Sequence, residues 1–229
     1  MNNNERLIWL GGKIIPINEA TINVLSPSSQ FGLNVFEGIR CYWSDQEKQL
    51  YAFRLIDHIK RLQQSIKLMR INCPYSTDDF RKAINDVIKA NHYQEDIAVR
   101  QTVFVDGVGG TWNSTEPVNM FVAPISKHFT PIEKKNGLRC QFSSWERISD
   151  CNMTPRAKVG ANYINSRMAY LEATQNGYDT ALFLNNQGKV SEGPGSCFFM
   201  VRDNKLITPP VTASILESIT RDTIIKSAK

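Results

Sequence analysis

Two short segments of the chain carry side chains that could do chemistry together. Lys158 stands among small or apolar residues, and Tyr163 follows it closely. Further on, Glu192 opens the glycine-rich run Glu192-Gly193-Pro194-Gly195. Apolar surroundings favour the neutral, nucleophilic form of a lysine amine. A glycine–proline turn points the carboxylate at its start in a fixed direction.

An amine and a carboxylate of these kinds are what a pyridoxal-phosphate enzyme needs. The amine of Lys158 would condense with the cofactor aldehyde and then carry a proton between the substrate α-carbon and the cofactor. Glu192 would keep the pyridine nitrogen protonated, so that the ring draws electrons from the substrate. Taken singly, a lysine is usually a solvated charge and a glutamate in a turn a surface residue, so the prediction depends on the pair.

The cofactor phosphate needs donors of its own, and two places in the chain offer them. A helix predicted to begin near Ile219-Thr220 would present backbone N–H groups and the positive end of its dipole to an anion. Arg61, beside the apolar face of another predicted helix, could add a forked cationic contact. Each feature alone also has an ordinary structural explanation, because every helix has such an end and an arginine often lies along apolar surface.

Hydrophobic spacing predicts the elements that position these residues. Apolar runs indicate strands, and apolar residues three and four apart indicate helices. The first part of the chain predicts a hairpin at 8–15, strands at 39–43, 50–53, 99–105 and 118–124, a helix at 56–70 and a helix capped by Ser76. The second part predicts a strand at 138–145, a helix at 161–175, a strand at 180–185, a hairpin at 197–208 and a last helix from Ser218 that still runs at Lys229.

The domain organisation follows from a change in composition. A polar, proline-containing stretch at 126–137 predicts an interdomain linker. It separates a small α/β domain at 1–125 from a larger, strand-rich cofactor-binding domain at 138–229. Strands mixed with segregated helices favour the α+β class. The last predicted helix has no cap before the final residue, which is compatible with a natural C-terminus and equally with a second domain that continues further.

The composition limits the classes of function. Of 229 residues, 41% are hydrophobic and 21% charged, and the net charge of +5 is spread without a basic run. Neither nucleic acid nor a membrane is therefore an expected partner. The five cysteines form no CxxC pair, which favours free, mostly buried thiols in a cytoplasmic protein over disulfides or a metal site. The N-terminus lacks the apolar core of a signal peptide.

The order of several motifs resembles that of class IV aminotransferases, and in particular of branched-chain amino-acid aminotransferases. The resemblance covers nearly the whole chain, and it implies fold type IV, pyridoxal 5'-phosphate as cofactor, amino acids and 2-oxo acids as substrates, and a homodimer or higher oligomer. The motifs are, in order, Val35-Phe36-Glu37-Gly38-Ile39-Arg40, His58-Ile59-Lys60-Arg61-Leu62, Ala157-Lys158-Val159-Gly160-Ala161-Asn162-Tyr163, Ser191-Glu192-Gly193, Thr208-Pro209-Pro210 and Ser218-Ile219-Thr220-Arg221-Asp222.

The resemblance also implies roles at the cofactor. Lys158 matches the lysine that binds the cofactor covalently. Tyr163 matches the phenol beside the ring hydroxyl, and Glu192 matches the acid at the ring nitrogen. Arg61 matches the phosphate arginine, and the backbone N–H groups of Ile219 and Thr220 match the family's phosphate contacts.

At the substrate, the resemblance implies three further residues. Phe36 and Gly38 match positions that line the substrate pocket. Arg100 matches the arginine that meets the distal carboxylate of glutamate or 2-oxoglutarate. In these relatives the loop equivalent to 109–112 reaches the active site of the partner subunit, so Trp112 is either a residue of the neighbouring pocket or an ordinary loop aromatic.

Four positions depart from the family pattern. Phe31 and Ala98 stand where tyrosines are usual, Ile125 stands near a usual tryptophan, and Cys197 stands where an asparagine is usual. A site that lacks a designed hydrogen-bond donor can lose roughly 2–4 kcal/mol of discrimination. Substrates other than leucine, isoleucine and valine are therefore compatible with the sequence.

The sequence predicts transamination of a small L-amino acid, of the branched-chain type, with 2-oxoglutarate. Two alternatives stay open. The first keeps the cofactor and changes the reaction, as in a lyase of the aminodeoxychorismate type or a D-amino-acid or amine transaminase. The second is a shortened homologue that keeps the fold without catalysis.

Overall fold

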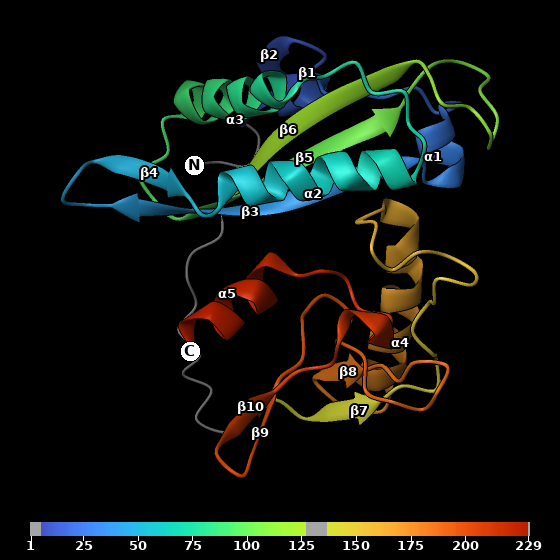
Figure 1. Ribbon diagram of the computed structural model, residues 1–229. Helices are drawn as coiled ribbons and strands as arrows, with labels where there is room; N and C mark the ends of the chain where they lie inside the picture. Colours follow the sequence, from blue (N-terminus) through green and yellow to red (C-terminus); the bar gives the residue numbers. More distant parts are fainter. Residues whose placement is uncertain (1–5, 127–136, 229) are drawn as a thin grey trace. The chain divides into compact units, whose positions relative to one another are not determined.

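The computed structural model describes residues 6–126 and 137–228 (Figure 1). Its contacts divide the chain into two units. The first holds Met1–Pro131 and Val159–Ala161, and the second holds Ile132–Lys158 and Asn162–Lys229. The chain therefore leaves the second unit directly after Lys158 and returns to it at Asn162. The predicted linker at 126–137 lies, apart from its two end residues, outside the described residues.

A six-stranded antiparallel sheet forms the centre of the first unit, in the order β2-β1-β6-β5-β3-β4 (Figure 1). The predicted hairpin at 8–15 is β1–β2, and both glycines of its turn have positive φ angles of 55° and 91°, which residues with a side chain rarely adopt. The strands are β1 (Leu7–Leu10), β2 (Lys13–Pro16), β3 (Asn34–Ser44), β4 (Gln49–Ala52), β5 (Ile97–Val105) and β6 (Val118–Ser126).

The described part of this unit has the helices α1 (Pro27–Phe31), α2 (Leu55–Leu68) and α3 (Thr77–Asn91), with the short 3-10 helix η2 (Ile17–Glu19) after β2. The predicted stripe of α2 is buried at Ile59, Leu62 and Ile66. Ser76 caps α3 in a capping box with Asp79, as its sequence position predicts.

Both long helices cover the same face of the sheet. Glu37 of β3 and Gln101 of β5 are partners in the register, so their side chains point to one side. Glu37 is bonded to α2 through Arg61, and the side-chain amide of Gln101 donates to the carbonyl of Phe80 in α3 at 3.1 Å. The residues next to Glu37 along β3 therefore point to the opposite face.

The second unit, as far as it is described, is built from short strands and helices. β7 (Cys140–Phe142) pairs in parallel with β8 (Thr180–Leu182), and β9 (Met200–Arg202) pairs in antiparallel with β10 (Lys205–Ile207). The helices are α4 (Tyr163–Gln175), which follows the 3-10 turn η3 (Gly160–Asn162), and α5 (Ile219–Ser227), which follows the 3-10 turn η4 (Val211–Ala213). Small side chains allow α4 to pack closely on β8, with a fully buried cluster of Ala169, Ala173, Ala181 and Phe183.

The α+β class agrees with the prediction, while several boundaries differ. The strands expected at 138–145 and 180–185 shrink to Cys140–Phe142 and Thr180–Leu182, because among the described residues each pairs only with the other. The last helix, expected to run still at the end of the sequence, ends at Ser227 with Ala228 as its C-cap, and Lys229 lies outside the described residues. The expectation of mostly buried thiols is also wrong, since Cys41 is buried while Cys73 and Cys197 are half-buried and Cys140 and Cys151 are exposed.

Across the residues that the structure describes, there is no helix with the length and apolar character that crossing a membrane requires.

Candidate active site

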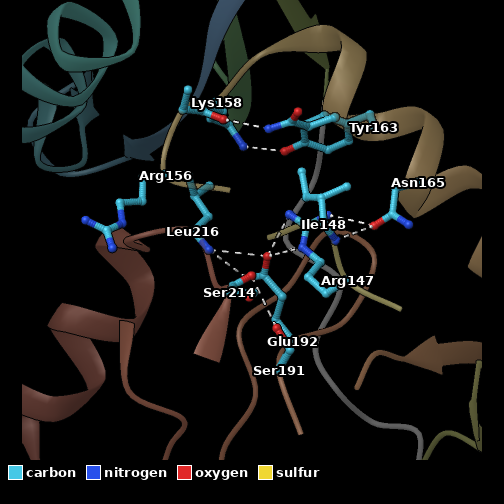
Figure 2. A network of polar contacts seen from close by, with 12 residues as sticks. Arg147, Ile148, Arg156, Lys158, Tyr163, Asn165, Ser191, Glu192, Ser214 and Leu216 are labelled. Atoms are coloured by element: carbon cyan, nitrogen blue, oxygen red, sulfur yellow. Dashed lines mark hydrogen bonds and ion pairs between the residues drawn. The ribbon is translucent and has the colours of Figure 1, made fainter. Parts of the chain in front are cut away.

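Lys158 and Tyr163 lie in direct contact within the second unit (Figure 2). The Lys158 Nζ atom donates to the Tyr163 hydroxyl at 2.6 Å, and both side chains are half-buried. The loop before the lysine is closed by the amide of Asn162, which donates to the carbonyls of Thr154 at 3.0 Å and Ala157 at 3.2 Å. Because Asn162 directly precedes α4, the same side chain fixes the lysine loop to the helix that carries the tyrosine.

The three residues after the lysine belong to the first unit and are held on its strand β3. Val159 forms an isolated bridge with Val35. A Cβ atom added to Gly160 would lie 2.5 Å from Oδ1 of Asn34, so the Asn34 side chain would have to move to admit a larger residue. The segment after Lys158 is therefore held close to β3.

Glu192 lies buried beside strand β8. Two backbone hydrogen bonds join this segment to Phe183: the Phe183 carbonyl accepts from the Ser191 N–H at 2.9 Å, and the Phe183 N–H donates to the Glu192 carbonyl at 2.9 Å. Its carboxylate accepts from the Nε atom of Arg147 at 3.0 Å, and the backbone N–H of Leu216 lies 3.3 Å from each oxygen (Figure 2). Burial raises the pKa of Glu192, and the charge of Arg147 offsets part of that rise.

The turn that brings Leu216 to Glu192 has an unusual backbone. Ser214 has a φ of 64°, in the left-handed region that residues with a side chain rarely occupy. Its carbonyl accepts a hydrogen bond from the hydroxyl of Ser191 at 3.3 Å. Ser191 is fully buried, so the residue before the carboxylate helps hold the turn that donates to it. Such strain is often found at functional sites.

Arg147 is the residue of this site that the sequence did not reveal. Its Nη1 atom donates to Oδ1 of Asn165 at 3.3 Å, and its guanidinium carbon lies 5.5 Å from the centre of the Phe183 ring. Its backbone N–H donates to the carbonyl of Leu184 at 2.8 Å. A buried carboxylate needs a cation, and that rule predicts a partner for Glu192, but nothing in the sequence marks which cation it is.

The predicted phosphate-binding helix start is present in α5. The helix begins at Ile219, and the hydroxyl of Ser218 caps it by accepting from the N–H of Arg221 at 3.1 Å. Arg221 in turn donates to the hydroxyl of Thr208 at 3.1 Å and to the carbonyl of Pro209 at 2.9 Å. This arginine therefore anchors the first turn of α5, with its outward-pointing N–H groups, to the end of β10.

The predicted substrate residues lie together in the first unit. Phe36 and Gly38 are two apart on β3, and Arg100 is the register partner of Gly38 on β5, so all three occupy the sheet face opposite α2 and α3. The Arg100 guanidinium carbon lies 4.2 Å from the centre of the Phe36 ring. Arg61 lies on the helix side, where its guanidinium binds Glu37.

The side chains of the second unit fit pyridoxal phosphate. The cofactor carries its aldehyde and its hydroxyl on neighbouring ring carbons, and the contact between Lys158 Nζ and Tyr163 Oη places an amine and a phenol side by side. A carboxylate held by an arginine suits the protonated ring nitrogen, and a helix start suits the phosphate. The arrangement can bind an aldehyde covalently, stabilise a cationic ring and move a proton.

Comparison with known proteins gives consistent matches. Residues 34–229 match the protein family described as Amino-transferase class IV. The branched-chain-amino-acid aminotransferase of Escherichia coli (strain K12) is 36% identical over 227 residues, which cover 97% of this chain and 72% of that protein.

Solved structures match equally closely. The branched-chain amino acid aminotransferase from Thermobaculum terrenum in its PLP form is 41% identical and superposes with a TM-score of 0.90. The match covers 99% of this chain and 74% of that chain. The T.th branched-chain amino acid aminotransferase complexed with N-(5'-phosphopyridoxyl)-L-glutamate is 35% identical and superposes with a TM-score of 0.90. The match covers 98% of this chain and 73% of that chain.

Proposed function

This chain belongs to the class IV aminotransferase family, and on that premise we propose that it transfers the amino group of a branched-chain L-amino acid to 2-oxoglutarate. The fold is fold type IV, the cofactor is pyridoxal phosphate, and the chain is an aminotransferase. The contact of Lys158 with Tyr163 is the observation that carries the proposal at the level of residues. It places a nucleophilic amine beside a phenol, as covalent binding of the cofactor requires.

Each cofactor-binding residue has a distinct role in this proposal. Bound pyridoxal phosphate supplies an aldehyde that takes up the amino group and a ring that withdraws electrons from the substrate α-carbon. Lys158 would hold the cofactor through its aldehyde carbon, and its amine, once free, would serve as the base that moves the proton of the substrate α-carbon. Tyr163 orients the Lys158 amine, and Glu192 keeps the ring nitrogen protonated. Ile219 and Thr220 donate backbone N–H groups to the phosphate, and Arg61 adds its charge.

The reaction proceeds as two half-reactions on one site. In the first, the amino acid would gain its carbonyl oxygen from water and leave as its 2-oxo acid, while its amino group stays on the enzyme; the second would return the water. In the second, another 2-oxo acid accepts that amino group, so the amino group and the electron pair lost by the first substrate are gained by the second. Such exchange gives ping-pong kinetics.

The substrate assignment is supported by the sheet face that carries Phe36, Gly38 and Arg100. An aromatic ring suits an aliphatic side chain, and an arginine suits the distal carboxylate of 2-oxoglutarate. The relatives are named for branched-chain amino acids, and the T.th enzyme was solved with a phosphopyridoxyl-glutamate. Ala98, register partner of Arg40 near this face, lacks the hydroxyl that is usual there, so we expect acceptance of unbranched aliphatic substrates as well.

We further propose a cytoplasmic homodimer. Five free thiols suit a reducing compartment. In the loop between β5 and β6, Val108 is 74% exposed and Trp112 is 73% exposed. Exposed apolar side chains at one loop tip are typical of a surface that a second copy covers.

A covalent-trapping experiment tests the function. Reduction of the protein with borohydride in the presence of pyridoxal phosphate should fix the cofactor on the peptide that contains Lys158. The Lys158→Ala variant should lose trapping and transamination of L-leucine, while Lys205→Ala, which removes an exposed lysine of β10, should keep both. Activity of Lys158→Ala at the level of the unchanged chain would refute the assignment.

The same preparation separates the alternatives. Transamination requires that L-leucine convert the bound cofactor to its amine form with one equivalent of 2-oxo acid. Release of a 2-oxo acid without conversion of the cofactor to its amine form would favour a lyase. A higher rate with D-alanine than with L-leucine would favour a D-amino-acid transaminase. A protein that stays colourless with added pyridoxal phosphate would favour a homologue without catalysis.

A further inference from the structure

Glu37 is a buried carboxylate to which the proposed chemistry assigns no role. It lies in the middle of β3, and its side chain is 0% exposed. Arg61 of α2 binds it with two parallel hydrogen bonds, from Nε to Oε1 at 2.7 Å and from Nη2 to Oε2 at 2.7 Å. The Nδ1 atom of His58, one turn earlier on the same helix, lies 2.8 Å from Oε2.

These contacts keep Glu37 ionised in the interior. Burial alone would raise the pKa of Glu37, but the hydrogen bonds from Arg61 and His58, together with the charge of Arg61, hold it below its ordinary value of 4.5. With the carboxylate charged, the Nδ1 atom of His58 carries the proton and donates it. The three side chains therefore form one ionic unit with a single defined geometry.

Stability alone does not account for such a unit. A buried ion pair replaced by apolar residues of similar volume often leaves a protein as stable or more stable, because two charges must be removed from water. A pair of this kind can instead provide orientation. A two-point contact with a carboxylate fixes the plane and direction of a guanidinium, whereas one contact would leave it free to rotate.

The contact also fixes which edge of the Arg61 guanidinium meets Glu37. The carboxylate occupies the edge formed by Nε and Nη2. The Arg61 side chain is 14% exposed, so a fixed guanidinium is largely enclosed, with a small accessible part.

We propose that Glu37 is a positioning residue that sets the direction of Arg61 toward the cofactor phosphate, and that His58 fixes the carboxylate which does so. This role rests on the proposed function, because it requires the contact of Arg61 with the phosphate. It assigns Glu37 no contact with the substrate or the reacting atoms. Its effect on the cofactor passes entirely through Arg61.

Comparison of pyridoxal phosphate with unphosphorylated pyridoxal isolates that effect. The full chain and its variants are titrated with each compound, and binding is followed by absorbance without any turnover. Glu37→Gln should weaken binding of pyridoxal phosphate about tenfold while changing binding of pyridoxal less than about twofold, because one charge-assisted contact acts on the phosphate alone. A merely structural role would weaken both compounds equally, and that result overturns the proposal.

A double variant tests whether Glu37 acts through Arg61. Arg61→Ala should remove most of the preference for the phosphorylated compound. Adding Glu37→Gln to Arg61→Ala should change the preference no further, since the group that Glu37 positions is gone. An undiminished effect of Glu37→Gln without Arg61 overturns the positioning role.

A pair of variants at His58 keeps the test decisive if Glu37→Gln does not fold. His58→Leu removes the donor to Glu37 and should lower the phosphate preference, whereas His58→Asn keeps an N–H near the place of Nδ1 and should restore it. Equal preference in these two variants counts against the proposal. One outcome separates the two proposals: the unchanged chain prefers pyridoxal phosphate, Arg61→Ala abolishes that preference, and the Glu37 and His58 variants keep it. In that case the proposed function stands and only the positioning role fails. If the unchanged chain has no preference, both fail.

Discussion

The Nη2 atom of Arg147 lies 2.8 Å from Oε1 of Glu192, and each side chain is 8% exposed. The two residues are far apart in the sequence, and the pair joins the loop after β7 to the turn after β8. Burial and the arginine act on the pKa of Glu192 in opposite directions, the first favouring a neutral carboxyl and the second an anion. An anion is the form that can hold a protonated ring nitrogen, so the arginine keeps Glu192 fit for its proposed role.

Replacement of Arg147 by methionine should therefore damage both stability and chemistry. The substitution removes the cation that is hydrogen-bonded to buried Glu192 and leaves only the more distant charge of Lys158, and loss of one partner of a buried pair typically costs about 3 kcal/mol or more in the free energy of unfolding. The carboxyl should then favour its neutral form, and transamination should slow by roughly tenfold or more. Urea unfolding and single half-reaction rates measure the two effects.

Arg139→Met is the matched control for that variant. Arg139 and Asp179 form an ion pair at 3.7 Å in which the side chains are 73% and 37% exposed, and exposed pairs contribute little to stability. The control should unfold and react much as the unchanged chain does. A comparable loss in both variants would mean that loss of any arginine in the second unit is harmful, and that Glu192 needs no special partner.

Arg147 also shows where prediction of the site from sequence stops. Lys158 and Glu192 have distinctive neighbours in the sequence, and those neighbours are what single the two residues out. Arg147 follows Trp145 and Glu146 in a loop without periodicity, and it is one of 27 basic residues. Its importance comes from a pairing between distant segments, which spacing along the chain does not encode.

Tyr163→Phe should weaken control of the Lys158 amine without unfolding the chain. The variant loses the hydroxyl that accepts from Nζ at 2.6 Å and keeps the ring. Loss of one charge-assisted hydrogen bond should reduce the rate about tenfold. Tyr170→Phe removes a hydroxyl from the same helix at a side chain that is 45% exposed, and it should have no effect on the rate. Equal rates for the two variants would contradict a role for the Tyr163 hydroxyl.

The pairing of Glu37 should make stability depend on pH in acid. Its folded-state pKa lies below the ordinary value of 4.5, so near that pH the native chain binds fewer protons than the unfolded chain. The stabilising contribution is therefore complete above about pH 4.5 and is lost as the pH falls through the folded-state pKa. The difference in melting temperature between the unchanged chain and Glu37→Gln should be large at neutral pH. It should shrink as the pH falls through the folded-state pKa of Glu37.

Asp78→Asn supplies the comparison for the pH series. The Asp78 side chain is 89% exposed at the start of α3, so its substitution should give a small difference in melting temperature that changes little with pH. A Glu37→Gln difference that stays constant down to strongly acidic pH would show that the loss comes from packing and not from the carboxylate charge.

Local pattern accounts for the helices better than for the short strands. α2 and α3 have apolar stripes, and Ser76 with Asp79 marks the start of α3, so spacing and capping alone locate them. β7 and β8 have three residues each because, within the described chain, they pair only with each other, and beyond Phe142 the chain turns as Ser143 bonds to Glu172 of α4. Phe183 and Leu184 extend the apolar run past β8, so the sequence predicts a longer strand there than the available partner supports.

Arg100→Ala should separate the two classes of acceptor. Arg100 stacks on Phe36 with its guanidinium carbon 4.2 Å from the ring centre, so one face combines a cation for a second carboxylate with an apolar surface for an aliphatic chain. Loss of the arginine should raise KM for 2-oxoglutarate by roughly tenfold to a hundredfold, the range for a charged hydrogen-bonding partner. KM for the monocarboxylic 2-oxo acid of leucine should change little, since the Phe36 ring remains. Arg100→Lys retains a point charge without the fork and should be intermediate. Equal losses with both acceptors would mean that Arg100 supports the sheet face in general and does not recognise the distal carboxylate.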